Sequence, residues 1–428
     1  MLKCGLLGGK LEHSYSPEIH ALLGDYEYEL YEKTPAEAEV FLRHGGFDAL
    51  NVTIPHKKTA AALCAELSPI VRRLGSVNTI VCAKDRSMTA SSDPTGRILY
   101  GTNTDYAGFL ALLRRSRVSV SGCKYLVLGS GGASVTVQAV LNDLGAGEVV
   151  VISRSGADNY ENLERHADAD ILVNTTPVGM YPDNGEKPLD LSVFKGLMAV
   201  FDLIYNPART ALMMQAETLG IPTFGGLPML VAQAEASSRV FTAADPAHPD
   251  EDPLRSAAKI RTICDFLDRT QQNIALIGMP GCGKTAVAKA LAERTGREVF
   301  DADEEIEQRT GRLIPEIFAE SGEEGFRALE TEVLADLGKR SGCILSTGGG
   351  CVTRPENYGL LHQNSRIVWI KRDVSLLETE GRPLSQANDI SQIYVVRKPL
   401  YERFADFSVV NDGTPETCAA SICKELGI

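Results

Sequence analysis

The sequence predicts an α/β protein of several domains, built on parallel sheets that helices cover. Short apolar runs such as "KYLVLG", "EVVVISR", "IALIGM" and "RIVWIK" alternate with helical patterns along the chain. Strands that are almost wholly apolar are typical of parallel sheets buried on both faces. Two glycine-rich loops, around residues 130 and 280, each lie between such a strand and a helix. A length of 428 residues favours roughly two to four compact domains.

The net charge of the chain argues against some classes of binding partner. The formal net charge of −13 and the isoelectric point near 5.2 oppose binding to nucleic acid or to an anionic membrane, because both need a basic face. We therefore expect small-molecule partners. The ten cysteines form no CxxC pair and accompany only seven histidines, which suggests neither a zinc site nor a disulfide framework. Lys10 and Glu12 interrupt the first apolar stretch, so we expect no export signal and a cytoplasmic location.

Further apolar runs predict four more strands: "DALNVTI", "ADILVN", "MAVFDLI" and "CILSTG". Residues 242–253, "TAADPAHPDEDP", are rich in Pro, Asp and Ala and predict a surface loop or linker. After them, apolar residues at helical spacing over 254–267 predict a helix that packs on the first half of the chain. We expect the last domain to begin near residue 271.

The first glycine loop lies in a strand–turn–helix–strand unit over residues 123–155. Gly129, Gly131 and Gly132 let the backbone turn tightly and approach a pyrophosphate at the start of a helix, as in Rossmann-type dinucleotide-binding domains. Ser134 stands where the strict GxGxxG pattern has its last Gly or Ala. The second strand ends in "SRS", without the acidic residue that takes the ribose hydroxyl of NAD. A cation there predicts NADP(H); the alternative is an ordinary solvated arginine.

Upstream, "HSYSPEIH", "NVTIPHK", "GSVNTI" and "GTNTDYAGF" each place small hydroxyl or amide side chains at a strand end or in a loop. Lys57 and Asp105 are the charged residues of interest among them. Taken singly, Lys57 would be a surface lysine and Asp105 a helix cap. With "NTTPVGM", "FDLIYNPART" and "GLPMLVAQA" further on, however, these motifs occur in the order typical of one enzyme family.

Over almost all of residues 1–240, the chain resembles shikimate dehydrogenase. The resemblance implies reversible hydride transfer from NADPH to 3-dehydroshikimate, with Lys57 and Asp105 as the catalytic pair. The substrate-binding residues that it implies are Ser14, Ser16, Asn51, Thr53, Asn78, Tyr205 and Gln233. The cofactor-binding residues are Gly129, Gly131, Gly132, Ala133, Ser153, Arg154, Ser155 and Met180. Tyr106 stands where some members carry Gly, and acceptance of quinate stays open.

The second glycine loop, "GMPGCGKT" over residues 278–285, matches GxxxxGK[ST] between a strand and a helix. Its backbone amides suit phosphates, its lysine reaches the β- and γ-phosphates, and its threonine hydroxyl can bind Mg²⁺. The motif indicates a nucleoside triphosphate and leaves the acceptor open. The ATP-binding residues that we expect are Gly278, Gly281, Cys282, Gly283, Lys284 and Thr285.

Residues 271–428 resemble shikimate kinase through "FDADEE", "GFRALE", "STGGG", "GRPLS" and "RKPLYERFAD". Taken singly, Asp301 and Asp303 would be helix-capping acids, and Arg327 and Glu330 would form an exposed i,i+3 pair. The resemblance implies ATP as donor, Mg²⁺ as metal and catalytic roles for Asp303, Lys284 and Arg382. Thr285 and Asp301 would hold the metal. The residues implied for shikimate are Asp303, Arg327, Gly348, Gly349, Gly350 and Arg397.

The predicted architecture has three lobes. Residues 1–101 and 226–268 form an open α/β substrate domain, residues 102–225 a Rossmann-type NADP-binding domain, and residues 271–428 a three-layer P-loop kinase domain with a parallel sheet. Two alternatives to a bifunctional enzyme stay open. In the first, only the dehydrogenase is active, because the lid segment 376–394 of the kinase is short and carries Ser385 where Leu is usual. In the second, the chain is a regulator that uses both folds to sense the metabolites.

Overall fold

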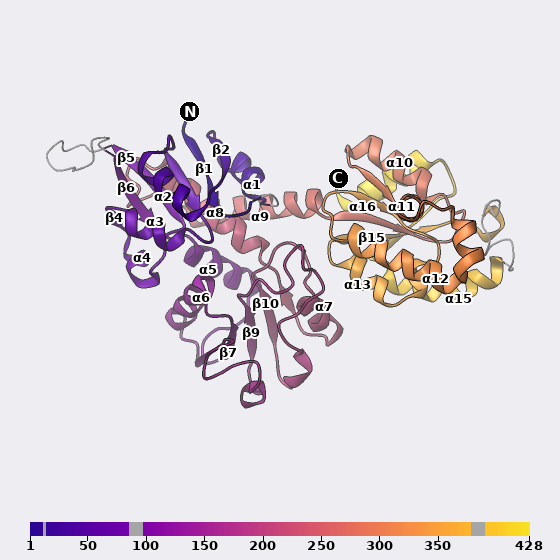
Figure 1. Cartoon of the computed structure of the whole chain (residues 1–428), viewed down its shortest axis with the longest axis horizontal. Coiled ribbons are helices and arrows are strands. Elements are labelled where there is room, and N and C mark those ends of the chain that lie inside the picture. The colour runs from indigo at the N-terminus through magenta and orange to yellow at the C-terminus, as the bar shows by residue number, and fades with distance from the viewer. Residues whose placement is uncertain (12–13, 85–96, 378–389) are drawn as a thin grey trace. The chain divides into compact units, whose positions relative to one another are not determined.

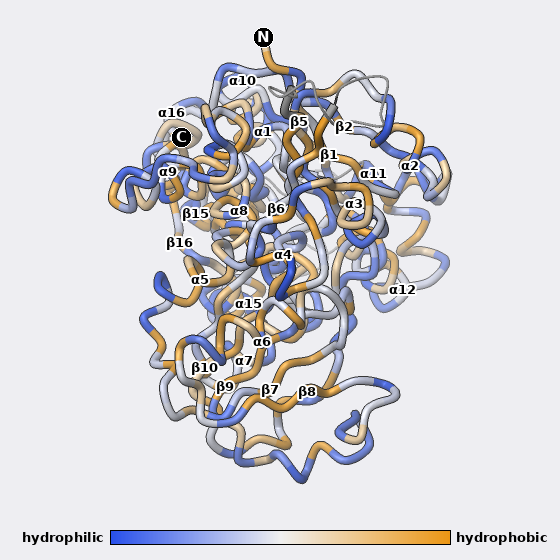
Figure 2. The backbone as a smooth tube through the Cα atoms, turned by 90° about the vertical axis from the view of Figure 1, so that its left-hand side faces the viewer, coloured by the Kyte–Doolittle hydropathy of each residue, from blue (hydrophilic) through white to orange (hydrophobic). Residues whose placement is uncertain are grey.

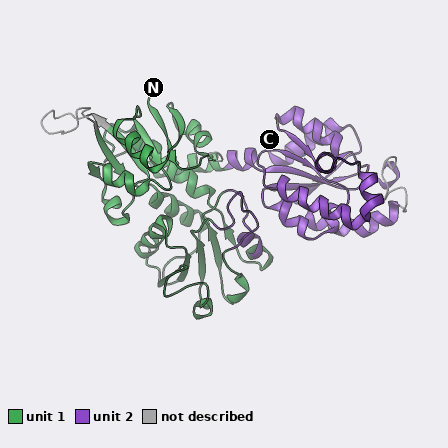
Figure 3. Cartoon of the chain, in the orientation of Figure 1, with its two compact units in different colours: residues 1–177, 188–205, 216–264 green, residues 178–187, 206–215, 265–428 purple. Residues whose placement is uncertain are grey.

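A computed structural model describes residues 1–11, 14–84, 97–377 and 390–428. The chain divides into two compact units (Figure 3): residues 1–177, 188–205 and 216–264, and residues 178–187, 206–215 and 265–428. Helix α9 (Pro253–Gln271) continues from the first unit into the second. Within the described ranges, no helix has both the length and the apolar composition needed to cross a membrane.

The first sheet of the first unit has six strands in the order β2-β1-β3-β5-β6-β4. They are β1 (Lys3–Gly8), β2 (Glu27–Glu32), β3 (Ala49–Val52), β4 (Glu66–Leu67), β5 (Thr79–Lys84) and β6 (Arg97–Thr102). Helices α1 (Ser16–Leu23), α2 (Pro35–His44), α3 (Lys57–Leu63) and α4 (Pro69–Leu74) join them. Residues such as Leu7, Leu42 and Leu50 form the core that α2 and the strands share.

Two pairings in this sheet, β3 with β5 and β5 with β6, are antiparallel, whereas the sequence pattern predicted only parallel strands. A parallel neighbour needs a crossover that can pack on the sheet. The residues between β5 and β6, "DRSMTASSDPTG", have no apolar periodicity with which to do so. Apolar runs reveal that a strand is buried, but they do not reveal its direction.

The second sheet is wholly parallel, in the order β11-β10-β9-β7-β8. Its strands are β7 (Lys124–Leu128), β8 (Glu148–Ile152), β9 (Ile171–Asn174), β10 (Ala199–Asp202) and β11 (Thr223–Phe224). Figure 2 shows β7 and β8 largely in the colours of apolar residues. With helices α5 (Asp105–Ser116) and α6 (Gly132–Asp143), they form the predicted Rossmann-type fold, which is confirmed. Helix α7 (Ala211–Thr218) precedes β11.

Helices α5 and α8 (Leu227–Thr242) pack closely together. Gly108 permits this approach, because a Cβ atom at this position would lie 2.8 Å from the carbonyl oxygen of Met229. The close packing brings the first turn of α5 next to the middle of α8. The residues that begin α5 therefore share one site with side chains more than a hundred positions later in the chain.

The second unit contains a five-stranded parallel sheet in the order β13-β14-β12-β15-β16. The strands are β12 (Asn273–Ile277), β13 (Val299–Asp301), β14 (Ile344–Ser346), β15 (Ser365–Lys371) and β16 (Phe407–Val410). The helices are α10 (Lys284–Thr295), α11 (Ala302–Thr310), α12 (Ile314–Leu337), α13 (Glu356–His362), α15 (Ile390–Phe404) and α16 (Pro415–Leu426). Figure 1 shows α10 and α16 over one face and α12, α13 and α15 over the other, which confirms the predicted three layers.

All eight apolar runs quoted from the sequence are strands, and the helix expected over 254–267 is α9. Only the last part of that helix is buried in the way its pattern suggested. Ile263, Cys264 and Leu267 are inaccessible, whereas Leu254 is 85% exposed. Residues 243–252, between α8 and α9, form no helix or strand. The domain boundaries given above stay predictions.

Candidate active sites

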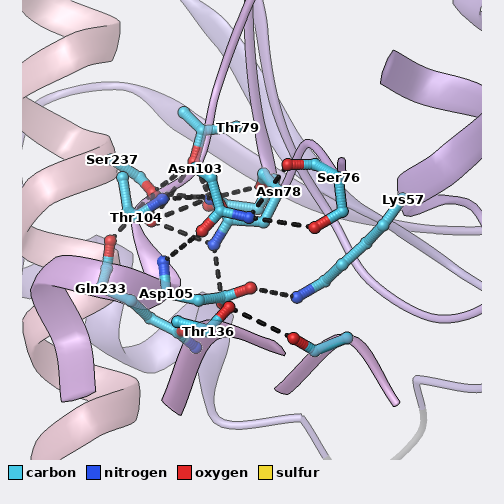
Figure 4. Close-up of polar contacts among 12 residues, drawn as sticks. Lys57, Ser76, Asn78, Thr79, Asn103, Thr104, Asp105, Thr136, Gln233 and Ser237 are labelled. Atoms are coloured by element: carbon cyan, nitrogen blue, oxygen red, sulfur yellow. Dashed lines mark hydrogen bonds and ion pairs between the residues drawn. The ribbon is translucent and has the colours of Figure 1, made fainter. Parts of the chain in front are cut away.

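Lys57 and Asp105 lie together in the first unit, each as the first residue of a helix. Lys57 begins α3 directly after β3, and Asp105 begins α5. Lys57 Nζ lies 2.6 Å from Asp105 Oδ2, and Figure 4 shows the two side chains pointing toward one another. Asp105 lies in the first turn of α5, at the positive end of the helix dipole. The lysine side chain is 24% exposed and the aspartate 9%, so the pair is largely shielded from solvent, the lysine less so than the aspartate.

Asn78 fixes the other oxygen of Asp105. Its Nδ2 donates to Asp105 Oδ1 over 2.8 Å, while the Asp105 amide donates to Asn103 Oδ1 over 2.9 Å. Both carboxylate oxygens therefore have donors, and the plane of the carboxylate is set. Because a lysine ammonium has three protons to donate, Nζ keeps two for other acceptors after its bond to Asp105.

A cluster of hydroxyl groups lies next to Asn78, which in turn contacts Asp105 (Figure 4). Ser237 Oγ, on α8, lies 2.8 Å from Asn51 Nδ2, 2.9 Å from Thr79 Oγ1 and 3.0 Å from Thr104 Oγ1. Thr79 in turn donates to Asn78 Oδ1 over 2.8 Å. The sequence had not singled out Ser237, Thr79 or Thr104. Ser237 follows Gln233 by four positions and so shares its helix face, which was the one available signal.

Asn51 is held from its other side by aromatic residues. Tyr28 donates its hydroxyl to Asn51 Oδ1 over 2.9 Å. The ring of His20 stacks on Tyr28 with centroids 3.9 Å apart, and its Nδ1 lies 2.7 Å from the Tyr26 hydroxyl. Burial lowers the pKa of His20 to about 3, so the ring is neutral at physiological pH. Asn51 therefore has a fixed orientation.

The other residues predicted to bind this substrate come from loops after strands of both sheets of the first unit and from α8. Because β1 and β3 are parallel neighbours with Leu7 paired to Val52, Ser14 and Ser16 follow one strand and Thr53 the other. Tyr205 follows β10, and its ring lies 5.2 Å from that of Tyr15. Burial raises the pKa of Tyr205 to about 12. Gln233 is half-buried on α8.

The first glycine loop connects β7 to α6. Gly129 has φ +100°, a conformation that favours glycine, and its added Cβ would touch Thr175. Gly131 and Gly132 face open space, since an added Cβ meets nothing within 4 Å. Ala133 is half-buried in the first turn of α6. Ser134 is buried and accepts a hydrogen bond from Gln138 Nε2 over 3.1 Å, so a serine satisfies the position where the strict pattern has Gly or Ala.

The "SRS" turn lies beside this loop. Leu128 pairs with Ile152, and the Gly129 amide donates to the Ile152 carbonyl over 2.8 Å. Ser153 therefore begins its loop at the same sheet edge as Gly129, and Arg154 and Ser155 follow it as exposed residues. Met180 lies in segment 178–187, and its predicted place at the nicotinamide stays a prediction.

The second glycine loop connects β12 to α10. Gly278, Gly281 and Gly283 have φ values of +151°, +79° and +92°, which glycine adopts without strain. Cys282 is fully buried between them. Lys284 is 8% exposed, and its Nζ donates to the carbonyls of Gly278 and Met279 over 3.0 and 3.1 Å. The lysine side chain is thus bonded to the backbone of its own loop.

Three acidic or hydroxyl groups meet beside this loop. Thr285 Oγ1 donates to Asp301 Oδ2 over 2.9 Å, and Asp301 caps α11 by accepting the Asp303 amide through Oδ1. Asp303 Oδ1 is buried and has no hydrogen-bond partner within the described part of the chain. Burial, with Asp301 and Glu330 nearby, raises the pKa of Asp303 to about 6. Asp303 is therefore a carboxylate that can exchange a proton near neutral pH.

Arg327 and Glu330 form an i,i+3 ion pair over 2.7 Å, but a buried one, with exposures of 7% and 0%. Burial raises the pKa of Glu330. Gly348 lies against these acids: an added Cβ would overlap Glu330 Oε1 and come within 3.0 Å of Asp303 Oδ1. An added Cβ on Gly350 would overlap the Arg327 guanidinium. Glycines at both positions are therefore required for the acids and the arginine to face a common space.

Helix α15 completes this site. Arg397 Nη1 donates to the Gly349 carbonyl over 3.2 Å, and the Tyr401 hydroxyl donates to the same oxygen. Tyr401, four residues after Arg397, had not been predicted. Gly349 also packs on the P-loop, since an added Cβ would lie 2.6 Å from Pro280. Arg382 lies outside the described residues.

Comparisons with known proteins give a family for the N-terminal part and another for the C-terminal part of the chain. A family model described as the shikimate dehydrogenase substrate binding domain matches residues 6–80, and one described as shikimate kinase matches residues 280–427. Shikimate dehydrogenase (NADP(+)) of Clostridium perfringens is 33% identical over 258 residues, which cover 55% of this chain and 91% of that protein. Shikimate kinase of Burkholderia lata is 43% identical over 152 residues, covering 33% and 82%.

A solved structure agrees for the first unit. Shikimate dehydrogenase 1 from Peptoclostridium difficile is 31% identical, covers 62% of this chain and 98% of its own, and superposes with a TM-score of 0.53. The geometry of both sites and these likenesses lead to one conclusion. The chain belongs to the shikimate dehydrogenase family in its N-terminal part and to the shikimate kinase family in its C-terminal part.

Proposed function

We propose that the chain is a bifunctional enzyme of aromatic amino acid biosynthesis. Its first activity reduces 3-dehydroshikimate to shikimate with NADPH, and its second phosphorylates shikimate to shikimate 3-phosphate with ATP and Mg²⁺. The observation that carries the proposal is the Lys57–Asp105 pair, 2.6 Å apart, in a chain that also holds a P-loop beside Asp303. The acidic composition and the ten cysteines, all of them thiols, support small-molecule substrates and a cytoplasmic location.

The residues assigned to each activity follow from the two sites. Residues 1–101 and 226–268 would bind the first substrate, residues 102–225 would bind NADP(H), and residues 271–428 would carry the kinase. Residues 242–253, between α8 and α9, would be a surface loop or linker. The boundaries rest on where the strands and helices of each sheet begin and end.

In the first reaction, Lys57 donates a proton to the carbonyl oxygen of the substrate as this oxygen becomes an alkoxide. Asp105 holds Nζ in place and stabilises its charge, while Asn78 keeps the carboxylate plane fixed. Bound NADPH supplies the hydride that reduces the carbonyl carbon. Ser14, Ser16, Asn51, Thr53, Tyr205 and Gln233 supply polar groups for the carboxylate and ring hydroxyls of the substrate.

The first glycine loop fits a dinucleotide. Gly131 and Gly132 leave open space at the start of α6, where the helix amides favour an anion. Arg154 and the two flanking serines stand at the adjacent strand end and suit a 2′-phosphate. These residues support NADP(H) over NAD(H).

In the second reaction, Asp303 accepts the proton of the shikimate hydroxyl as its oxygen bonds to the γ-phosphorus and the bond to the ADP oxygen breaks. The raised pKa of Asp303 suits this role. Arg327 and Arg397 lie where they can bind a carboxylate. Lys284 stabilises charge on the phosphoryl group, and we assign the same role to Arg382.

The P-loop also fits a magnesium nucleotide. Among the described residues, no cluster of three His, Cys, Asp or Glu could hold a metal alone. Thr285 Oγ1 and Asp301 Oδ2 offer two hard oxygen ligands 2.9 Å apart, and Mg²⁺ in kinases takes most of its other ligands from phosphates and water.

Two variants of the full chain separate the activities. Lys57→Ala should slow NADPH oxidation with 3-dehydroshikimate by about 10²-fold or more while phosphorylation of added shikimate continues. Lys284→Ala should slow the phosphorylation and leave NADPH oxidation unchanged. Normal phosphorylation by Lys284→Ala would overturn the kinase assignment. If the unaltered chain oxidises NADPH but never phosphorylates shikimate, only the dehydrogenase is active; if it binds both metabolites without turnover, it is a sensor.

A further inference from the structure

Arg372 lies beside the P-loop, although no part of the site described above uses it. It directly follows β15, which pairs in parallel with β12 so that Trp369 lies opposite Ile277. The residues after both strands therefore emerge at the same edge of the sheet. A Cβ atom built on Gly283, the last glycine of the P-loop, would lie 3.7 Å from Arg372 Nη1.

Among the described residues, the Arg372 guanidinium has no acceptor. No hydrogen bond or ion pair to it is found among the described residues, and its Nε is buried without a partner. The two other arginines of this site differ, because Arg327 pairs with Glu330 and Arg397 donates to Gly349. A buried donor on a charged group is costly when it has no acceptor. In a chain of net charge −13, an unpaired cation beside a phosphate-binding loop points to an anionic ligand.

Asn411 connects the backbone next to Arg372 to the P-loop. Its backbone amide donates to the Lys371 carbonyl over 2.7 Å, and its Nδ2 donates to the Cys282 carbonyl over 2.8 Å. The side chain is only 4% exposed and packs on Gly283, whose added Cβ would lie 2.7 Å from Nδ2. One buried amide thus connects the residue before Arg372 to the loop that binds phosphates.

We propose that Arg372 binds a phosphate oxygen of the nucleotide held at the P-loop, and that Asn411 is the positioning residue that holds Arg372 against this loop. The inference rests on the proposed nucleotide site of the second unit and adds a cation to it. A guanidinium offers a planar pair of donors that matches phosphate oxygens. Its position beside Gly283, rather than at the shikimate-facing glycines, assigns it to the nucleotide and not to the acceptor.

The test is nucleotide binding by the full chain, measured by calorimetry with MgADP and, separately, with inorganic triphosphate. Arg372→Ala should raise both dissociation constants about 10-fold, the effect of losing one hydrogen bond to a charged group. Arg372→Lys should retain part of the affinity. Shikimate binding should not change. Arg366→Ala is the matched control, because Arg366 is an exposed residue near the other end of the same strand, and it should bind both probes normally.

Fluorescence of Trp369, the single tryptophan of the chain, checks that each variant keeps the second unit folded. A lowered unfolding midpoint with unchanged MgADP binding would show that Arg372 only supports the loop, and would overturn the proposal. Weaker MgADP binding with unchanged triphosphate binding would place the arginine on the base or ribose, and would also overturn it.

Asn411→Ala should raise KM for ATP without changing KM for shikimate, and its effect should shrink when Arg372 is already Ala. Independent effects of the two substitutions would exclude the positioning role. Binding of MgADP by a chain that does not phosphorylate shikimate would overturn the kinase assignment while leaving the Arg372 contact supported.

Discussion

Lys57 Nζ and Asp105 Oδ2 lie 2.6 Å apart, each carried by the first residue of a different helix. The two residues are 48 positions apart in the sequence, and β3 and the packing of α5 on α8 bring them together. Asn78 holds the second carboxylate oxygen. The pair is thus oriented before any substrate binds, which is what a positioned proton donor requires.

Replacement of Lys57 should therefore affect turnover more than binding. We expect Lys57→Ala to lower dehydrogenase kcat by about 10²- to 10⁴-fold, the usual contribution of general acid–base catalysis, with a small change in KM. Steady-state NADPH oxidation measures both constants. Lys58→Ala is the control, since Lys58 is the exposed neighbour. Equal loss in the two variants would mean that the helix, and not the ammonium group, matters.

Arg154 should set the preference between cofactors. Arg154→Asp removes a cation at the end of β8 and supplies the acid that binds a ribose hydroxyl. We expect the ratio of kcat/KM for NADPH to that for NADH to fall by about 10- to 100-fold, in line with the loss of charge-assisted hydrogen bonds. Arg165→Asp, at another exposed arginine of the same lobe, should leave the ratio unchanged. An unchanged ratio in Arg154→Asp would refute the assignment.

The raised pKa of Asp303 predicts how the kinase responds to pH. As pH falls below about 6, the carboxyl becomes protonated and cannot accept a proton, so kcat/KM for shikimate should fall by about 10-fold per pH unit. Asp303→Asn should abolish turnover at every pH. A rate that stays constant down to pH 5 would argue against Asp303 as the base.

The same shift predicts a change in stability. Because the folded pKa of about 6 exceeds the ordinary aspartate value of 3.8, the folded state binds the proton more tightly, and stability falls as pH rises between these values. Asp303→Asn should therefore be more stable than the unaltered chain at pH 8, by at most about 3 kcal/mol, and similar near pH 3.5. Denaturant unfolding followed by Trp369 fluorescence measures this. Equal stability at pH 8 would contradict the prediction.

Gly348 should tolerate no side chain. In Gly348→Ala the new methyl group would overlap Glu330 Oε1 and crowd Asp303. Because overpacking of this kind displaces neighbours at a cost of about 1–3 kcal/mol, we expect shikimate phosphorylation to fall by about 5- to 150-fold. Gly359→Ala on α13 is the control, because its Cβ would meet nothing closer than 3.8 Å. Normal kinase activity in Gly348→Ala would mean that this loop lies away from the substrate.

Local pattern was enough to predict eight strands and both glycine loops, because apolar runs and glycine-rich turns are properties of short segments; strands such as β1, β2 and β5 were not among the quoted runs. The antiparallel pairings of β5 were not predictable, since a buried strand is apolar in either direction. The order of motifs allowed Lys57 and Asp105 to be named together through the family resemblance. The structure adds the distance and the role of Asn78.

Residues that join distant segments through hydroxyl groups escaped sequence reasoning. Ser237 contacts Asn51 across 186 positions and Thr104 across 133, and its spacing from Gln233 indicates a shared helix face but not these partners. Arg372 is similar: next to Lys371 it looks like a solvated charge, and only the position of Gly283 shows that it lies beside the P-loop. Burial of the Arg327–Glu330 pair also depends on how α12 packs.

The most direct test of the central claim is one reaction that holds the full chain with 3-dehydroshikimate, NADPH, ATP and Mg²⁺, with products identified by mass. Two consecutive activities predict shikimate 3-phosphate, formed with oxidation of NADPH and release of ADP. Omission of ATP should stop the conversion at shikimate. Accumulation of shikimate with ATP present, or no conversion of 3-dehydroshikimate at all, would contradict the claim that this chain catalyses both steps.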